Sequence, residues 1–226
     1  MTDSPVTLVT GASRGLGHAL ALEAARRGHH VIALARTVGG LEELDDAIKA
    51  EAGHCTLVPL DLTDDPALDR LAEAIAGRWG KLDTWFHCAA YAAPLSPAPM
   101  IDNKEITRSL DLNVKALARL IAVLDRLLRT APAGRAVLMD DRHEGESYWA
   151  TYAATKAAAR AIWQSWGQET RKSAFRAVLA CPPPMPTAVR ARFYPGENRD
   201  GLTHPSAVAP RLLEALAAPG AEIDLR

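Results

Sequence analysis

Short apolar runs alternate along the chain with longer segments in which apolar residues recur at helical spacing. The apolar runs, rich in Val, Leu and Ala, cover residues 6–10, 30–35, 55–60, 84–88, 136–139 and 175–181. The helical segments cover residues 16–27, 41–52, 64–79, 104–129 and 150–172. Strands that alternate with helices in this way pair in parallel, and the helices pack on both faces of the sheet. The pattern therefore predicts an α/β fold with a doubly wound parallel sheet.

The segments between these elements carry residues that stop helices and turn the chain. Gly28 and Gly53 each follow a helical segment, and prolines break the region 94–99 before the long helix. Residues 182–204 are rich in Pro, Gly, Arg and Asn, which predicts a loop that covers a binding site. Residues 205–218 predict a closing helix and residues 221–225 a last edge strand. Because no repeat or linker interrupts the 226 residues, we expect a single domain.

Charge and cysteine content limit the kinds of partner. The 26 Lys and Arg residues nearly balance the 27 Asp and Glu residues, so no net field favours nucleic acid or an anionic membrane. Cys55, Cys88 and Cys181 lack the spacing of a zinc site or a disulfide pair, so we expect buried, reduced thiols and no metal. The N-terminus has no signal pattern, and no apolar run is long enough to span a bilayer. These features predict a cytoplasmic protein that binds a small molecule.

The most informative motif is TGASRGLG at residues 10–17, between the first predicted strand and the first predicted helix. Glycines there let the chain turn tightly and bring the helix N-terminal N–H groups against a pyrophosphate. A glycine-rich turn alone can be an ordinary loop, but further βα units in register favour dinucleotide binding and a Rossmann-type fold. We therefore expect a dinucleotide to contact Gly11, Ser13, Gly15, Leu16 and Gly17.

The end of the second strand predicts which dinucleotide is preferred. An acidic residue there binds the adenosine ribose diol, whereas a basic residue accepts the 2′-phosphate. This chain has Arg36 at that point, and Arg14 within the glycine turn can approach the same phosphate. Either arginine can equally be a solvated surface charge, so NADP is preferred and NAD is possible. Asp61, after the third strand, is expected near the adenine.

A second motif is YAATK at residues 152–156, which places Tyr152 and Lys156 at i and i+4 on one helix face. A phenol with a pKa of about 10 is a poor acid–base catalyst at neutral pH. A nearby ammonium stabilises the phenolate and brings that pKa into range. The pair alone is a weak motif, because Tyr and Lys also share amphipathic helix faces.

The glycine turn, Asn113 within LDLNV, and YxxxK together resemble the short-chain dehydrogenase/reductase family in order and spacing. The resemblance covers nearly the whole chain and implies NAD(P)-dependent interconversion of an alcohol/carbonyl pair. It implies that Tyr152 acts as acid/base, that Lys156 holds the ribose and tunes the tyrosine, and that Asn113 positions a proton-relay water. It also implies a homodimer or homotetramer. Further cofactor contacts are expected at Leu62, Ala89, Ala90, Pro182 and Thr187.

The chain departs from the family at the end of the fifth strand, where a serine usually donates a hydrogen bond to the substrate carbonyl. Asp141 is the best positional match for that serine. An ionised carboxylate cannot donate to a carbonyl oxygen, and its charge disfavours the phenolate. A protonated Asp141 can donate. His143 and Ser147 are possible substitutes in the same loop, although an ordinary loop role is favoured for both.

Two cofactor-side motifs are also altered. The fourth-strand motif, usually Asn-Asn-Ala-Gly, reads HCAA at residues 87–90, and the turn after the sixth strand reads PPP at residues 182–184. Alanine in place of glycine narrows the approach of a cofactor, and proline lacks an N–H donor. His87 is interpreted as a packing or hydrogen-bonding residue, because no second metal ligand has a usable spacing.

Three functions remain open. An NADP(H)-dependent oxidoreductase is favoured because Asn113, Tyr152 and Lys156 are retained. A catalytically impaired NADP(H)-binding regulatory or partner protein would explain the altered motifs, and the same fold can catalyse lyase or isomerase chemistry. In the covering segment 182–204, Met185, Phe193 and Tyr194 predict apolar and aromatic contacts to the substrate. Three arginines of this segment could bind an acidic substrate, although arginines in loops are more often solvated charges: Arg190, Arg192 and Arg199.

Overall fold

The computed structural model describes residues 4–226. Its centre is a seven-stranded sheet in the order β3-β2-β1-β4-β5-β6-β7, and every neighbouring pair of strands is parallel. The strands are β1 Val6–Thr10, β2 His30–Ala35, β3 His54–Pro59, β4 Thr84–His87, β5 Arg135–Met139, β6 Arg176–Cys181 and β7 Glu222–Asp224. This is the predicted doubly wound, Rossmann-type sheet in a single domain.

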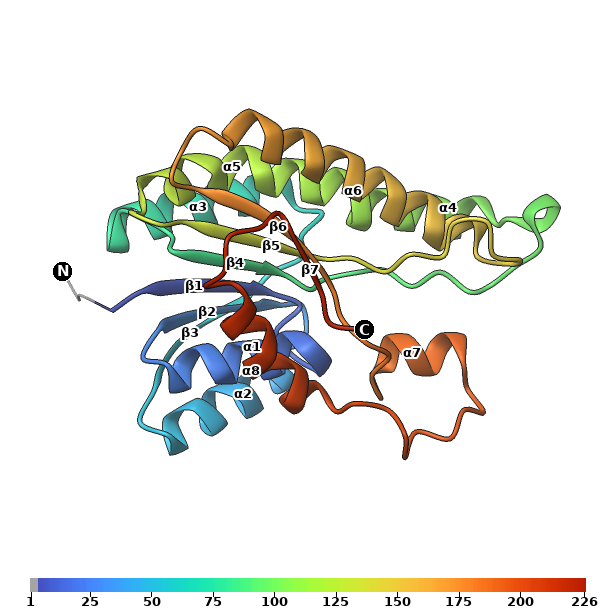
Figure 1. The fold of residues 1–226 in the computed structure, drawn as a ribbon, viewed down its shortest axis with the longest axis horizontal. Helices are drawn as coiled ribbons and strands as arrows, with labels where there is room; N and C mark the ends of the chain where they lie inside the picture. The colour runs from blue at the N-terminus through green and yellow to red at the C-terminus, as the bar shows by residue number, and fades with distance from the viewer. Residues whose placement is uncertain (1–3) are drawn as a thin grey trace.

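Helices cover both faces of the sheet (Figure 1). One face carries α1 Gly15–Arg26, α2 Val38–Ala50 and α8 Pro205–Ala215. The other carries α3 Asp65–Trp79, α4 Asn103–Leu110, α5 Ala116–Thr130 and α6 Ala150–Thr170. Successive strand residues point to opposite faces. Leu8 therefore packs under α3 and α5 while Val9 packs under α1 and α2, so the two hydrophobic cores lie on either side of the sheet.

Two predicted elements differ from the observed ones. The predicted helix at 104–129 is divided into α4, a π-helical turn at Asp111–Lys115, and α5. The amphipathic pattern continues through the π turn, so the periodicity of the sequence predicts one uninterrupted helix. The predicted loop at 182–204 contains a short helix, α7 Ala188–Phe193, because the side chain of Thr187 caps it by accepting a hydrogen bond from the Arg190 N–H.

The cysteine and membrane expectations can be compared with residues 4–226. Cys181 is buried as expected, but Cys55 and Cys88 are only partly buried, because Cys55 lies in the edge strand β3 and Cys88 lines the cleft after β4. None of the helices in the described part of the chain is long and apolar enough to cross a membrane. No three His, Cys, Asp or Glu side chains among these residues are grouped to hold a metal ion.

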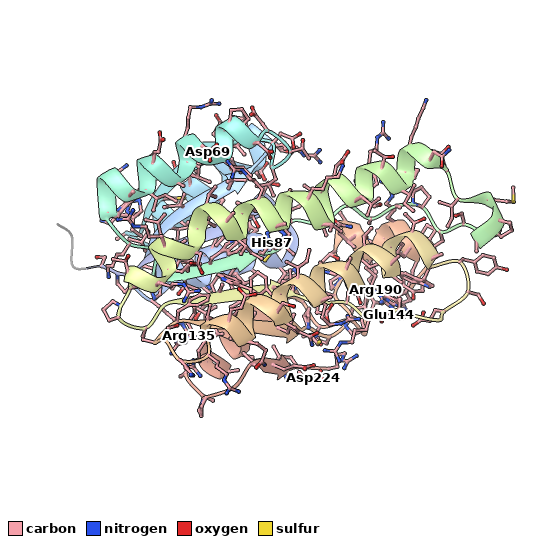
Figure 2. All side chains as sticks on the ribbon, turned by 90° about the horizontal axis from the view of Figure 1, so that it is seen from above. Asp69, His87, Arg135, Glu144, Arg190 and Asp224 are labelled. Atoms are coloured by element: carbon pink, nitrogen blue, oxygen red, sulfur yellow. The ribbon has the colours of Figure 1, made fainter. Side chains whose placement is uncertain are left out.

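The order of the strands creates the site. After β1 the chain crosses to α1 on one face, and after β4 it runs to α4 on the other face. The carboxyl ends of β1 and β4 therefore border a crevice, the usual ligand position in an open α/β sheet. Figure 2 shows Glu144 and Arg190 at the end of the molecule toward which β5 and β6 run, and Arg135 at the opposite end of β5.

Candidate functional site

A cleft of about 820 Å³ opens at the carboxyl edge of the sheet. It brings together nearly all the residues expected to contact a cofactor or substrate. Asn113 and Asp61 are the two predicted site residues that do not line it. The predicted residues that do line it are Gly11, Ser13, Arg14, Gly15, Leu16, Gly17, Arg36, Leu62, Ala89, Ala90, Asp141, Tyr152, Lys156, Pro182 and Thr187.

The glycine turn leaves no room for side chains. Gly11 has φ +74°, and a Cβ there would lie 2.8 Å from the backbone nitrogen of Ala89. A Cβ on Gly17 would lie 2.3 Å from the carbonyl oxygen of Gly11. Helix α1 starts at Gly15, and within the described chain no side chain caps its first N–H groups and no acidic residue lies in its first turn. The start of α1 thus presents N–H donors and a positive helix end to the cleft.

The two arginines expected at a 2′-phosphate are both exposed at the cleft rim. The Arg36 side chain is 64% exposed, and its guanidinium lies 4.0 Å from a carboxylate oxygen of Asp61. An exposed pair at this distance contributes little to stability. Both arginines can therefore turn toward an anion in the cleft.

Tyr152 and Lys156 lie one turn apart on α6 and both face the cleft. The Tyr152 hydroxyl donates a hydrogen bond to Asp141 Oδ2 at 3.2 Å, and Lys156 Nζ donates to the Met139 carbonyl oxygen. Burial and the Asp141 carboxylate raise the pKa of Tyr152 well above its ordinary value. Burial lowers the pKa of Lys156. The expected effect of Asp141, which disfavours the phenolate, is thus present, and the tuning of Tyr152 by Lys156 stays a prediction.

Asn113 lies in the π-helical turn and is buried. Its Oδ1 accepts from the Tyr91 N–H at 2.7 Å, and its Nδ2 donates to the Tyr91 carbonyl and to Thr155 Oγ1, both at 3.0 Å. The side chain thus ties the segment after β4 to α6, and both of its N–H groups are used within the protein. The water relay implied by the family resemblance stays a prediction.

Asp141 is oriented by the residue before it. Asp140 is buried and bridged by Arg142 and Arg160, with N–O distances of 3.0 Å to each. The Asp141 N–H donates to Asp140 Oδ1 at 3.0 Å, and this turns the Asp141 side chain toward Tyr152. Asp141 therefore presents to the Tyr152 hydroxyl a carboxylate that accepts hydrogen bonds, and its correspondence to the usual serine stays a prediction.

His143 contacts Asp141, although an ordinary loop role was expected for it. Its Nε2 lies 3.0 Å from Asp141 Oδ1, and its ring stacks on Trp149 with centroids 3.6 Å apart. It lines the cleft, as do Trp149 and Tyr91, neither of which was predicted. Ser147 is exposed and does not line the cleft. The available signal for Trp149 was that an aromatic residue lies three positions before Tyr152.

His87, at the end of β4, is buried and acts as a packing residue, as interpreted. Its Nδ1 lies 2.8 Å from Thr10 Oγ1, and its ring meets the edge of Trp85. Burial and the nearby Lys156 charge lower the pKa of His87 to about 3. The imidazole is therefore neutral in the folded protein at any pH near neutrality.

The His87 environment predicts acid sensitivity. The unfolded chain binds a proton near pH 6.5 and the folded chain does not until about pH 3, so stability falls as the pH drops below 6.5. Between pH 7 and pH 5 this group should cost about 2 kcal/mol. Urea unfolding at pH 7 and pH 5 measures how much free energy of unfolding each protein loses between the two pH values. This loss should be smaller by about 2 kcal/mol in His87→Asn than in the unaltered protein. An equal loss in both proteins would contradict the prediction.

Comparison with known proteins is consistent with this geometry. The family model for short chain dehydrogenases matches residues 5–198. The chain belongs to the short-chain dehydrogenase family. Oxidoreductase YciK of Escherichia coli strain K12 is 29% identical over 213 residues, which cover 92% of this chain and 84% of YciK. Oxidoreductase Lmo0432 of Listeria monocytogenes is 28% identical over 202 residues, covering 88% and 81% of the two chains.

Solved structures of the family superpose closely. A short chain dehydrogenase from Salmonella enterica serovar Typhi has a TM-score of 0.92 at 27% identity, covering 98% of this chain and 95% of its own. A short chain dehydrogenase from Escherichia coli CFT073 in complex with NADPH has a TM-score of 0.89 at 28% identity, covering 97% and 95%. The sequence and fold are thus those of a short-chain dehydrogenase type of oxidoreductase.

Proposed function

We propose that this short-chain dehydrogenase is an NADP(H)-dependent oxidoreductase that interconverts an alcohol and a carbonyl compound. One observation carries the proposal: the glycine turn, Arg36 and the Tyr152–Lys156 pair all open into the same cleft. A dinucleotide bound at the turn would extend along the carboxyl edge toward Tyr152. The complexes of family relatives with NADP and NADPH support the same choice of cofactor.

The residues present fit a dinucleotide. The space that a Cβ on Gly11 or Gly17 would fill is kept open, and the N–H groups at the start of α1 have no other partner in the described chain. In this proposal the pyrophosphate lies against residues 11–17, Arg14 and Arg36 bind the 2′-phosphate, and Lys156 holds the nicotinamide ribose. When bound, the nicotinamide supplies or accepts a hydride.

Tyr152 would provide the proton. Its hydroxyl keeps its proton at neutral pH because burial and Asp141 raise its pKa. During reduction the hydroxyl would turn from Asp141 to the substrate oxygen and donate its proton as negative charge develops there. The segment 182–204 would cover the substrate, since Met185, Phe193 and Tyr194 line the cleft.

The alternative of a catalytically impaired cofactor-binding protein rests on Asp141 and on the altered motifs at residues 87–90 and 182–184. The relatives are named as oxidoreductases and dehydrogenases, which supports an enzyme. The cytoplasmic location and the homodimer or homotetramer stay predictions.

Cofactor preference tests the roles of the arginines. Arg36→Ala should weaken NADPH binding by about tenfold to a hundredfold, because a charge-assisted hydrogen bond contributes about 1.5–3 kcal/mol. NADH affinity should change little. Titrations that follow quenching of the five tryptophans measure both affinities. Arg70→Ala, an exposed arginine on α3 outside the cleft, is the matched control. Equal loss of both cofactors, or of neither, would contradict the assignment of Arg36.

A further inference from the structure

The Asp141 carboxylate accepts a hydrogen bond from the hydroxyl that is proposed to donate to the substrate oxygen. Its Oδ2 accepts the hydroxyl of Tyr152, and its side chain is 48% exposed, on the cleft side. A neutral ketone placed against Tyr152 would bring its carbonyl oxygen next to this carboxylate. As the oxygen gains negative charge during reduction, the two like charges repel. The site as built therefore penalises an ordinary carbonyl substrate.

Within the described chain, no Lys or Arg side chain neutralises Asp141 at close range. Most arginines lining the cleft pair with other carboxylates: Arg142 with Asp140 and Glu222, Arg190 with Glu197, Arg192 with Glu105, Arg226 with Asp224 and Arg36 with Asp61. Arg14 lies at the far, glycine-turn side of the cleft, and Lys156 and Arg190 interact with Asp141 only at longer range. Lys156 donates to a backbone carbonyl. His143 is the side chain that contacts the other carboxylate oxygen. Asp141 Oδ2 is thus available for a positive charge brought in by a ligand.

The walls beside Asp141 are aromatic. The ring of Phe193 lies 4.5 Å from Trp149 and 4.9 Å from Tyr152, measured between centroids, and all three residues line the cleft. Aromatic faces combined with a carboxylate form a favourable environment for an organic cation, because the ring quadrupole attracts positive charge.

We propose that Asp141 is a specificity-determining residue for carbonyl substrates that carry a protonated amine close to the reacting carbon. The ammonium would bind Asp141 Oδ2 among the aromatic rings while Tyr152 donates to the adjacent carbonyl oxygen. The positive charge of the substrate then offsets the carboxylate that otherwise opposes the developing alkoxide. His143 acts as a positioning residue, since its contact with Oδ1 leaves Oδ2 facing the substrate.

This inference rests on the proposed function, and its redox step balances in the same way. In the reducing direction a hydride from the reduced nicotinamide adds to the carbonyl carbon, and the π electrons pass to the oxygen. That oxygen takes the Tyr152 proton, which solvent restores. The ammonium keeps its protons and its charge throughout, so its contribution is electrostatic.

The test compares amino ketones with neutral ketones in which a methyl group replaces the ammonium. With NADPH, the unaltered protein should have a kcat/KM about tenfold to a hundredfold higher for each amino ketone than for its neutral partner. Asp141→Asn and Asp141→Ser should remove that preference and increase turnover of the neutral ketones. Asp46→Asn, an exposed carboxylate on α2 without an ion pair in the described chain, should keep the preference.

A binding measurement gives a readout besides activity. Quenching of tryptophan fluorescence in the NADP-loaded protein should show amino alcohols binding more tightly than matched neutral alcohols, and Asp141→Asn should abolish the difference. Equal affinity for the two series, or a preference that survives Asp141→Asn, would overturn the inference. Turnover of neutral ketones that depends on Tyr152 would then still support the proposed function. Loss of NADPH binding in the unaltered protein would instead remove the proposed function itself.

Discussion

Tyr152→Phe will reduce NADPH-dependent turnover by about a hundredfold to ten-thousandfold, the range that a positioned general acid contributes. The change removes one oxygen and keeps the ring. Tyr152 is 3% exposed, and its ring packs edge-on against Phe193 with centroids 4.9 Å apart. Phenylalanine preserves this packing, so the fold and the dinucleotide cleft should be unchanged. The change removes the proton for the reacting oxygen and the hydrogen bond to Asp141.

The measurement separates chemistry from binding. Steady-state turnover of any accepted ketone should collapse, while the NADPH dissociation constant from fluorescence titration should change by less than about threefold, the effect of a surface substitution within 0.5 kcal/mol. Tyr148→Phe is the matched control, because Tyr148 lies four residues earlier, is 59% exposed and does not line the cleft. Unchanged turnover in Tyr152→Phe would refute the acid role of the tyrosine.

The pattern of the chain predicted the elements that local sequence determines. Strand ranges such as Val6–Thr10 and His30–Ala35 agree with the structure residue for residue, because buried parallel strands are continuous apolar runs. The glycine turn and the pair Tyr152–Lys156 could also be found from the sequence, because each is a local motif within one turn or on one helix face.

The geometry around Asp141 could not be predicted in this way. It depends on Arg160 of α6 and on Arg142, which together bridge the buried Asp140 and so turn the next residue toward Tyr152. The stacking of His143 on Trp149 likewise depends on the path of the whole loop. These contacts join residues of a loop to residues of a helix. The hydrophobic periodicity of the sequence does not predict how such residues lie relative to one another. The sequence singled out Asp141, but the contacts that turn its carboxylate toward Tyr152 became visible only in three dimensions.

Gly17→Ala should disrupt the glycine turn that is proposed to bind the dinucleotide. The added Cβ would lie 2.3 Å from the Gly11 carbonyl oxygen and 2.9 Å from the Gly11 carbonyl carbon, so backbone rather than a flexible side chain would have to move. Overpacking of this kind costs about 1–3 kcal/mol of stability. It should also displace the N–H groups at Gly15 that are proposed to bind the pyrophosphate, so NADPH affinity should fall by more than about tenfold, the equivalent of 1.4 kcal/mol.

Gly77→Ala makes the same chemical change in another helix. It distinguishes an effect on the proposed dinucleotide-binding turn from the general effect of alanine on helix stability. Gly77 lies in α3, and a Cβ there meets nothing within 4 Å. Alanine at this position should raise the free energy of unfolding by about 0.5–1 kcal/mol and leave NADPH affinity unaltered. If Gly17→Ala also bound NADPH normally, the close approach of Gly17 to Gly11 would be only a packing feature. Because the two substitutions add the same methyl group, a difference between them can come only from what surrounds each glycine.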